Sequence, residues 1–147
     1  MTAAELHHAI WDGVIGVLNE QGLELKYDRV EDIKRDICYN MGLSTEEVEI
    51  LDAGSFCVLC TCLRCRDCPL DIHYGGASCA NPRNPYCKMH EVIRHIANAK
   101  LHESVRVGKL KEAVKLAEEI RDVPLPEAYS KGLVTLFKEA VRREEQG

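Results

Sequence analysis

Residues 57–68 read Cys57-Val58-Leu59-Cys60-Thr61-Cys62-Leu63-Arg64-Cys65-Arg66-Asp67-Cys68. This stretch places five thiols in twelve positions, and Cys79 and Cys87 follow within the next twenty residues. Residues 55–84 as a whole show no sustained helical or strand periodicity and are interrupted by proline and by Gly75-Gly76. So long a stretch without secondary structure is unusual inside a compact domain. A bound metal would resolve the difficulty, because cross-linking the segment replaces the hydrophobic core that it lacks.

Helical patterns lie on both sides of this segment. Before it, three helices are each opened by a pair with capping-box spacing and closed by a glycine: Thr2 and Glu5 to Gly22, Asp28 and Glu31 to Gly42, and Ser44 and Glu47 to Gly54. After it, apolar spacing predicts a fourth helix from Asn84-Pro85 to Leu101, a fifth over 110–120, and a sixth over 129–141. The short connection after the fifth predicts that the last two are antiparallel neighbours.

The fold class expected is therefore all-α, with about six helices and a cysteine-rich metal-binding loop inserted between helices three and four. We expect residues 1–147 to form a single helical domain, since the length is that of one domain. Residues 55–90 would form the embedded cysteine-rich metal module. No run of 18 apolar residues predicts a membrane span, and no basic segment followed by an apolar stretch predicts a secretory signal.

Those features predict a cytoplasmic protein, in which thiols stay reduced and bind metal more readily than they form disulfides. The borderline-soft zinc ion matches thiolate, and four ligands close its tetrahedral shell. Cys-x-x-Cys spacing occurs in overlapping copies, and Cys87 with His90 is a mixed version on one helix face. The candidate ligands are Cys57, Cys60, Cys62, Cys65, Cys68, Cys79, Cys87 and His90.

The spacing leaves the number of ions open. Only four residues separate Cys60 from Cys65, far fewer than the roughly 15–20 residues of a zinc ribbon. We therefore expect Cys79 to complete the shell, with either one zinc and spare thiols or two zincs. An iron–sulfur site is the alternative: Cys62-x-x-Cys65-x-x-Cys68-Pro69 resembles the bacterial ferredoxin run, which implies a 4Fe-4S cluster with its fourth ligand from Cys79 or Cys87. In that run the proline follows the fourth cysteine, whereas here it follows the third.

A second resemblance covers residues 57–86, about a fifth of the chain. The string Cys57-x-x-Cys60, Cys65-x-x-Cys68-Pro69-Leu70, Gly75-Gly76-x-x-Cys79 and Pro85-Tyr86 resembles the small cysteine-rich zinc modules of uncharacterised phage and archaeal-virus proteins. The resemblance implies that Cys57, Cys60, Cys68 and Cys79 are ligands, with Cys65 as a competitor, while Cys62 departs from the pattern. It implies a metal and no particular activity.

Several other residues are better explained by packing than by chemistry. Cys38 is expected to be a buried core thiol, and Gly13-x-x-Gly16 to allow close packing. In His90-Glu91-x-x-x-His95 the second histidine is one residue too late for a metalloprotease helix, which turns it about 100° away. His7 and His8 should border the apolar stripe of the first helix. His73 is kept as a spare ligand.

The leading hypothesis is a structural zinc module in a small binding or adaptor protein that partners another protein and is not an enzyme. An iron–sulfur redox or sensor protein is the first alternative. A nucleic-acid-binding zinc protein is the second, through the basic residues of the metal loop: Arg64, Arg66, Arg83, Lys88 and Arg94. Its electrostatic support is small, because residues 55–95 have a net charge of only +2, against −8 for residues 1–54. The pattern leaves the oligomeric state open.

Overall fold

The computed structural model describes residues 1–53, 57–59, 68–75 and 81–146. Within these residues the protein is all-helical, with six α-helices of eight or more residues and no strand, which confirms the predicted all-α class and its six helices. The six are α1 (Ala3–Gln21), α2 (Val30–Asn40), α3 (Thr45–Asp52), α6 (Pro85–Ala97), α7 (Glu103–Arg121) and α8 (Leu133–Gln146). A short α5 (Pro69–His73) and two 3-10 turns, η1 (Gly22–Glu24) and η3 (Glu127–Ser130), complete the described elements. None of the described helices has the length and apolarity to span a bilayer.

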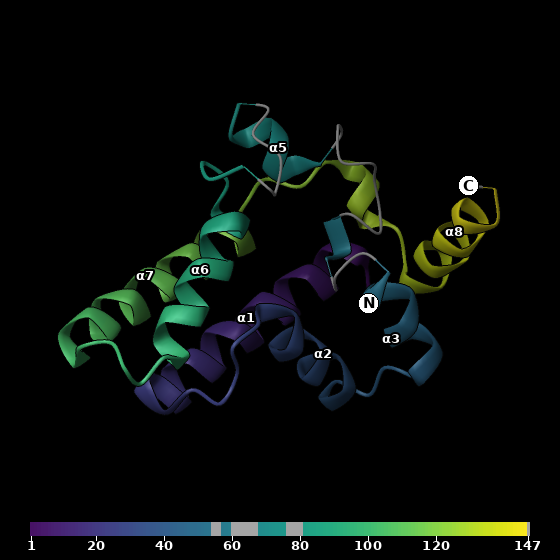
Figure 1. Ribbon diagram of the computed structural model, residues 1–147. Helices are drawn as coiled ribbons and strands as arrows, with labels where there is room; N and C mark the ends of the chain where they lie inside the picture. Colours follow the sequence, from purple (N-terminus) through teal and green to yellow (C-terminus); the bar gives the residue numbers. More distant parts are fainter. Residues whose placement is uncertain (54–56, 60–67, 76–80, 147) are drawn as a thin grey trace.

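Helix α1 runs through the middle of the molecule, with α7 packed on one side and α2 on the other (Figure 1). Helices α6 and α7 form a hairpin, while α3 and α8 lie together at the opposite edge. The prediction that the last two helices are neighbours is therefore wrong, because α8 packs against α3 and not along α7. The reason is the intervening segment 122–132, which is extended by two prolines and by η3 and so carries the chain across the molecule.

The helix ends follow the local signals in most places. Thr2 and Glu5 form a reciprocal capping box, with both hydrogen bonds at 3.2 Å, and Ser44 with Glu47 forms a second. Asn84 caps α6 by accepting a hydrogen bond from the Tyr86 backbone N–H at 2.9 Å. Gly54, the predicted end of the third helix, lies outside the described residues.

The predicted Asp28–Glu31 capping box is wrong. Helix α2 begins at Val30, its N-cap residue is Arg29, and no side chain caps it. The Glu31 carboxylate instead lies 3.3 Å from Nε2 of His90 on α6, so a tertiary contact takes the place of the local one.

The predicted bounds of the C-terminal helices also shift. Helix α6 ends at Ala97, four residues before Leu101, and α7 begins at Glu103 rather than at residue 110. His102 caps α7, because its Nδ1 accepts a hydrogen bond from the Ser104 backbone N–H at 3.1 Å. Helix α8 begins at Leu133, so Tyr129 belongs to η3 and not to the last helix.

The two ends of the described chain are joined by backbone hydrogen bonds. The Ala3 N–H donates to the Lys131 carbonyl at 2.9 Å, and the Leu133 N–H donates to the Met1 carbonyl at 3.1 Å. These bonds fix the start of α8 against the start of α1. They therefore hold α8 in place although α3 is its main helical neighbour.

Candidate metal centre and the neighbouring buried polar cluster

The eight predicted metal ligands divide into two groups of four. Cys60, Cys62, Cys65 and Cys79 lie outside the described residues. Cys57, Cys68, Cys87 and His90 are described, on three separate stretches of chain.

Cys57 adjoins a short stretch that is anchored in the core. The next two residues, Val58 and Leu59, are buried. The Leu59 carbonyl accepts a hydrogen bond from the Tyr129 hydroxyl at 3.0 Å, and Tyr129 is itself buried. The position of Cys57 is therefore tied to η3, far along the sequence.

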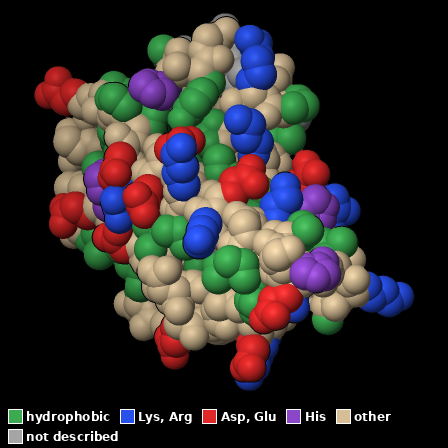
Figure 2. All heavy atoms as spheres, turned by 90° about the vertical axis from the view of Figure 1, so that its left-hand side faces the viewer, with side chains coloured by type: hydrophobic (Ala, Val, Ile, Leu, Met, Phe, Trp, Pro, Cys, Tyr) green, Lys and Arg blue, Asp and Glu red, His purple; other side chains and the backbone are tan. Residues whose placement is uncertain are grey.

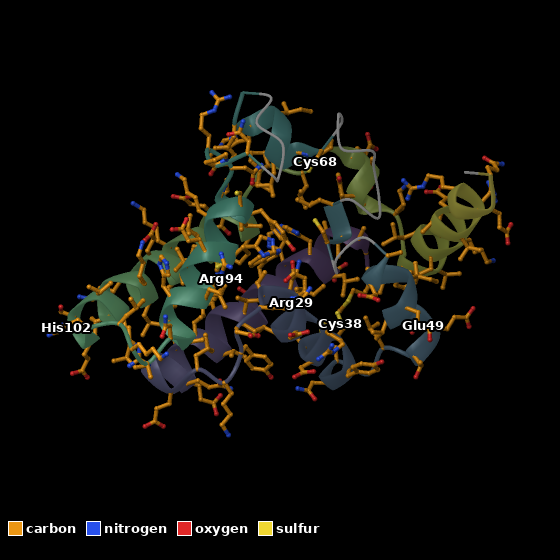
Figure 3. All side chains as sticks on the ribbon, in the orientation of Figure 1. Arg29, Cys38, Glu49, Cys68, Arg94 and His102 are labelled. Atoms are coloured by element: carbon orange, nitrogen blue, oxygen red, sulfur yellow. The ribbon has the colours of Figure 1, made fainter. Side chains whose placement is uncertain are left out.

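Cys68 stands at the N-cap of α5 and is only 5% exposed (Figure 3). Pro69 occupies the first helical position, where its fixed φ is compatible with the helix. Leu70 is buried and holds this short helix to the core, while the Tyr74 hydroxyl lies 3.5 Å from the Glu119 carboxylate on α7. Cys68 is thus held to the core through the residues that follow it in α5.

Cys87 and His90 lie three residues apart on α6, within its first two turns. Both are partly buried, and the spacing puts them on one face of the helix, as predicted. Burial lowers the pKa of His90, and the nearby Glu31 carboxylate acts in the opposite direction. Because Nε2 of His90 faces Glu31, the ring nitrogen that remains for a metal is Nδ1.

No metal centre is assembled by the described residues alone. Within ranges 1–53, 57–59, 68–75 and 81–146, no three His, Cys, Asp or Glu side chains gather closely enough to hold a metal ion. The predicted site therefore depends on the four cysteines outside these ranges, and it stays a prediction.

Cys38 is a different kind of cysteine from these. It is a fully buried free thiol on α2, away from Cys68 (Figure 3), which confirms its predicted place in the core. Burial raises its pKa to about 11. A thiol with this pKa stays protonated at neutral pH and is a poor nucleophile or metal ligand.

A buried lysine lies beside the candidate ligands of α6. Lys34 of α2 is 0% exposed, and its Nζ donates to the Tyr86 hydroxyl at 2.5 Å. The same nitrogen lies 4.5 Å from the centre of the Tyr86 ring and 5.5 Å from that of Trp11. The cation–π contacts and the hydrogen bond offset part of the cost of removing the Lys34 amine from water. Tyr86 also packs edge-on against His90, at 5.0 Å between ring centres.

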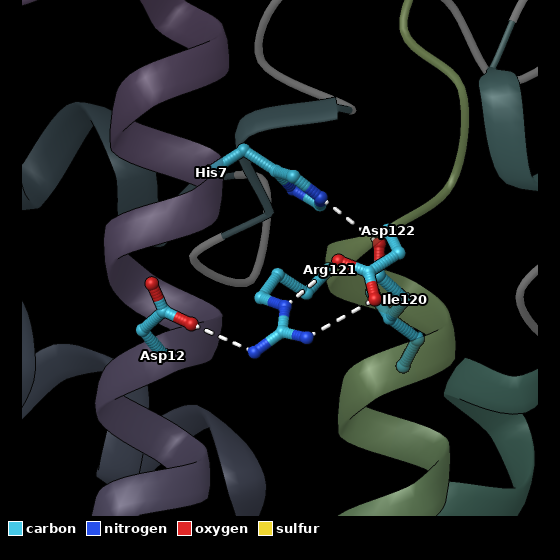
Figure 4. Close-up of polar contacts among 5 residues, drawn as sticks. All are labelled: His7, Asp12, Ile120, Arg121 and Asp122. Atoms are coloured by element: carbon cyan, nitrogen blue, oxygen red, sulfur yellow. Dashed lines mark hydrogen bonds and ion pairs between the residues drawn. The ribbon is translucent and has the colours of Figure 1, made fainter.

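The sequence patterns did not indicate that Lys34 is buried, and they underestimated the burial of His7. Lys34 lies four residues after Val30 and four before Cys38, so its helical position alone places it on the buried face of α2. His7 was expected at the border of an apolar stripe, yet it is 1% exposed, and its Nε2–H donates to the Ile120 carbonyl at 3.0 Å (Figure 4). Burial lowers the pKa of His7 to about 4.

The remaining candidates lie on the surface. His73 is exposed on α5 and stacks edge-on with Tyr74. His95 lies 3.9 Å from Glu91 of its own helix. Two of the basic residues proposed to contact nucleic acid, Arg64 and Arg66, lie outside the described residues. The others are exposed: Arg83, Lys88 and Arg94.

Figure 2 shows the face of the molecule on the side of α6 and α7. Basic and acidic side chains are interspersed over it, and neither sign forms a continuous patch. A surface of this kind gives little electrostatic attraction for a phosphate backbone.

Comparison of the chain with protein-family models, with curated proteins and with solved structures gives no match.

Proposed function

We propose that thiolates of the segment between α3 and α6 bind a structural zinc ion, and that the protein is a small helical binding or adaptor module. The observation that carries the proposal is the anchoring of Cys57, Cys68 and Cys87. Each adjoins a residue buried in the core, and between them the sequence holds four further cysteines. The two ends of the cysteine-rich segment, residues 57–87, are thus restrained. This restraint reduces the conformational entropy that the segment loses when its thiolates bind an ion.

The chemistry of the donors favours zinc. Thiolates are soft ligands, and the mixed pair Cys87 and His90 adds an imidazole of the kind found in Cys₃His sites. The contact between Glu31 and His90 supports this role for the histidine, because metal-binding histidines commonly donate their second N–H to a carboxylate. Glu31 would then orient the ring without touching the ion.

A structural role is favoured by the surroundings of the polar side chains. Lys34 and Tyr86 are reactive residue types, but both are buried and bonded to each other. Groups buried in this way stabilise the junction of α2 and α6 and are poorly placed to meet a substrate. We therefore infer a binding role rather than an enzymatic one.

Elemental analysis of anaerobically purified protein tests the proposal. We expect one or two zinc ions per chain and a colourless protein. A chelator should lower the melting temperature by about 10 °C or more, because structural zinc contributes on the order of 10–16 kcal/mol in small zinc domains. Replacing Cys68 with Ser should reduce zinc content, whereas the matched control Cys38→Ala should keep it.

Other results would contradict zinc. Iron, with absorption near roughly 400 nm, would indicate the iron–sulfur alternative. A metal-free protein whose melting temperature is unchanged by chelator would overturn the metal hypothesis altogether, as would complete pairing of the thiols as disulfides.

A further inference from the structure

Side chains of α3 and α8 line a groove. The two helices lie at the edge of the molecule opposite the α6–α7 hairpin (Figure 1). Its apolar lining consists of Ile50 from α3 and of Val134, Phe137 and Val141 from α8. Val134 is 69% exposed, although it lies in the same turn as the buried Phe137. Helix α8 thus covers only part of its apolar stripe with α3 and leaves the rest open to solvent.

The charges along the groove are distributed unequally between its two walls. The charged side chains that α3 contributes, Glu46 and Glu47, are both acidic, while α8 contributes Lys138 and Arg142, with Glu145 at its end. Glu46, Lys138, Arg142 and Glu145 make no ion pair within 4.0 Å to any residue in the described part of the chain. A helix that is apolar on one face and basic along its flank would therefore fit the groove, because its basic side chains could pair with Glu46 and Glu47 of α3.

We propose that this groove is a dimer interface, occupied by α8 of a second copy of the chain. Helix α8 has the required character, because Val134 and Val141 lie seven residues apart on one face and Lys138 and Arg142 flank it. In a two-fold arrangement α8 of each copy lies between α3 and α8 of the other. The basic flank of each α8 then faces Glu46 and Glu47 of the other copy.

The resulting interface has the form of a four-helix bundle. Two α3–α8 pairs contribute its helices, and the 14 residues of α8 extend for roughly 21 Å at about 1.5 Å per residue. The exposed Val134 and the partly buried Val141 would lie at the centre of the bundle. The backbone bonds of residues 1–3 to residues 131–133 hold each α8 in place, which limits the entropy lost on association.

Sedimentation velocity over a wide range of protein concentration tests the proposal on the purified full chain. We expect a monomer–dimer equilibrium whose dissociation constant rises by roughly tenfold or more in Val134→Lys, since the change buries a charge at the interface. Because Val134 is exposed, the change should leave the circular dichroism spectrum unaltered.

Charge reversal gives a sharper test, because it predicts a rescue. The Glu46→Lys chain and the doubly substituted Lys138→Glu, Arg142→Glu chain should each dimerise more weakly than the wild type, by roughly tenfold or more. In an equimolar mixture the two chains should form a heterodimer. In it, Lys at position 46 of one chain faces the acidic α8 of the other, and the unchanged α8 of the first chain faces the unchanged Glu46 of the second. Glu49→Lys is the matched control: Glu49 is exposed on α3 but does not line the groove (Figure 3), so its reversal should leave dimerisation unchanged.

Three outcomes would overturn the proposal. The first is a wild-type chain that stays monomeric at the highest concentration, which would leave the groove to a different partner. The second is a dimer that Val134→Lys does not weaken. The third is a mixture of the charge-reversed chains that forms no heterodimer. None of these results depends on whether the protein contains zinc.

Discussion

His7 is a titratable side chain in a core position, where α1 meets the C-terminal end of α7 (Figure 4). Its Nε2–H donates a hydrogen bond to the Ile120 carbonyl. The next residue, Arg121, donates a hydrogen bond to the Asp12 carboxylate of α1 at 2.9 Å. The exposed Arg121 pair is screened by water and contributes little. The buried histidine is different, because protonation would place a charge inside the core.

We expect His7 to make the protein less stable at mildly acidic pH. Its pKa falls from 6.5 to about 4 on folding, so between these values the unfolded chain binds a proton that the folded chain does not. The contribution of His7 to stability is therefore fully present above about pH 6.5 and is lost as the pH falls toward 4, by about 3 kcal/mol in total at about 1.36 kcal/mol per pH unit. Urea unfolding at a series of pH values measures this loss.

His8→Gln is the control for this prediction, since His8 is the exposed neighbour on the same helix. His7→Gln should remove most of the pH dependence between these two values, whereas His8→Gln should keep it. Equal pH profiles for the two variants would contradict the assignment to His7.

At the scale of single elements, Gly13 and Gly16 of α1 provide a matched pair of helical glycines. A Cβ on Gly13 would lie 2.8–3.0 Å from three side-chain carbons of Ile37 on α2, which confirms close packing at this position. A Cβ on Gly16 would meet no atom of the described residues within 4 Å, so among these residues the close packing expected there is absent.

The two alanine substitutions should therefore have opposite effects. Gly13→Ala should lower the free energy of unfolding by about 1–2 kcal/mol, because overpacking against Ile37 outweighs the better helix propensity of alanine. Gly16→Ala should raise it by about 0.5–1 kcal/mol, since only the gain in propensity and the smaller entropy of the unfolded chain remain. Chemical denaturation of both variants provides the measurement, and a change of the same sign in both would refute this account of the α1–α2 contact.

The elements also show what a sequence can predict. The six helices were predictable because capping residues and apolar spacing are local, as Thr2 with Glu5 and Asn84 illustrate. The observed helix ends differ from the predicted ones where a side chain makes a tertiary contact in place of a local one. Glu31, for example, contacts His90 instead of capping α2. The α3–α8 contact could not be predicted, since nothing local specifies which helix covers an apolar stripe.

The candidate site was predictable only as a set of residue types. Cysteine spacing indicates thiolate chemistry, but the anchoring of Cys57 through Leu59 and Tyr129 depends on residues seventy positions apart. Lys34 was missed because a charged residue on an apolar face is normally solvated, and its partners Tyr86 and Trp11 come from other helices. The metal itself stays a prediction.

At the scale of the whole molecule, the chain is held together by contacts between distant segments. Residues 1–3 bond to residues 131–133, and η3 bonds to the stretch that contains Cys57 through the Tyr129 hydroxyl. The segment from η3 to α8 therefore connects the N-terminus with one end of the cysteine-rich segment. A single hydroxyl is a convenient place to test this connection.

We expect Tyr129→Phe to lower the free energy of unfolding by about 1–3 kcal/mol, because it leaves the buried Leu59 carbonyl without this donor while keeping the ring. Tyr39→Phe is the matched control, since Tyr39 is exposed on α2, and its change should stay within about 0.5 kcal/mol. If the proposed zinc site includes Cys57, Tyr129→Phe should also release zinc to a chelator faster than Tyr39→Phe does. Equal unfolding free energies and equal rates of zinc release for the two variants would show that the Tyr129 hydroxyl does not hold the cysteine-rich segment to the core. Equal unfolding free energies with faster zinc release from Tyr129→Phe would show that the hydroxyl acts on the metal site alone.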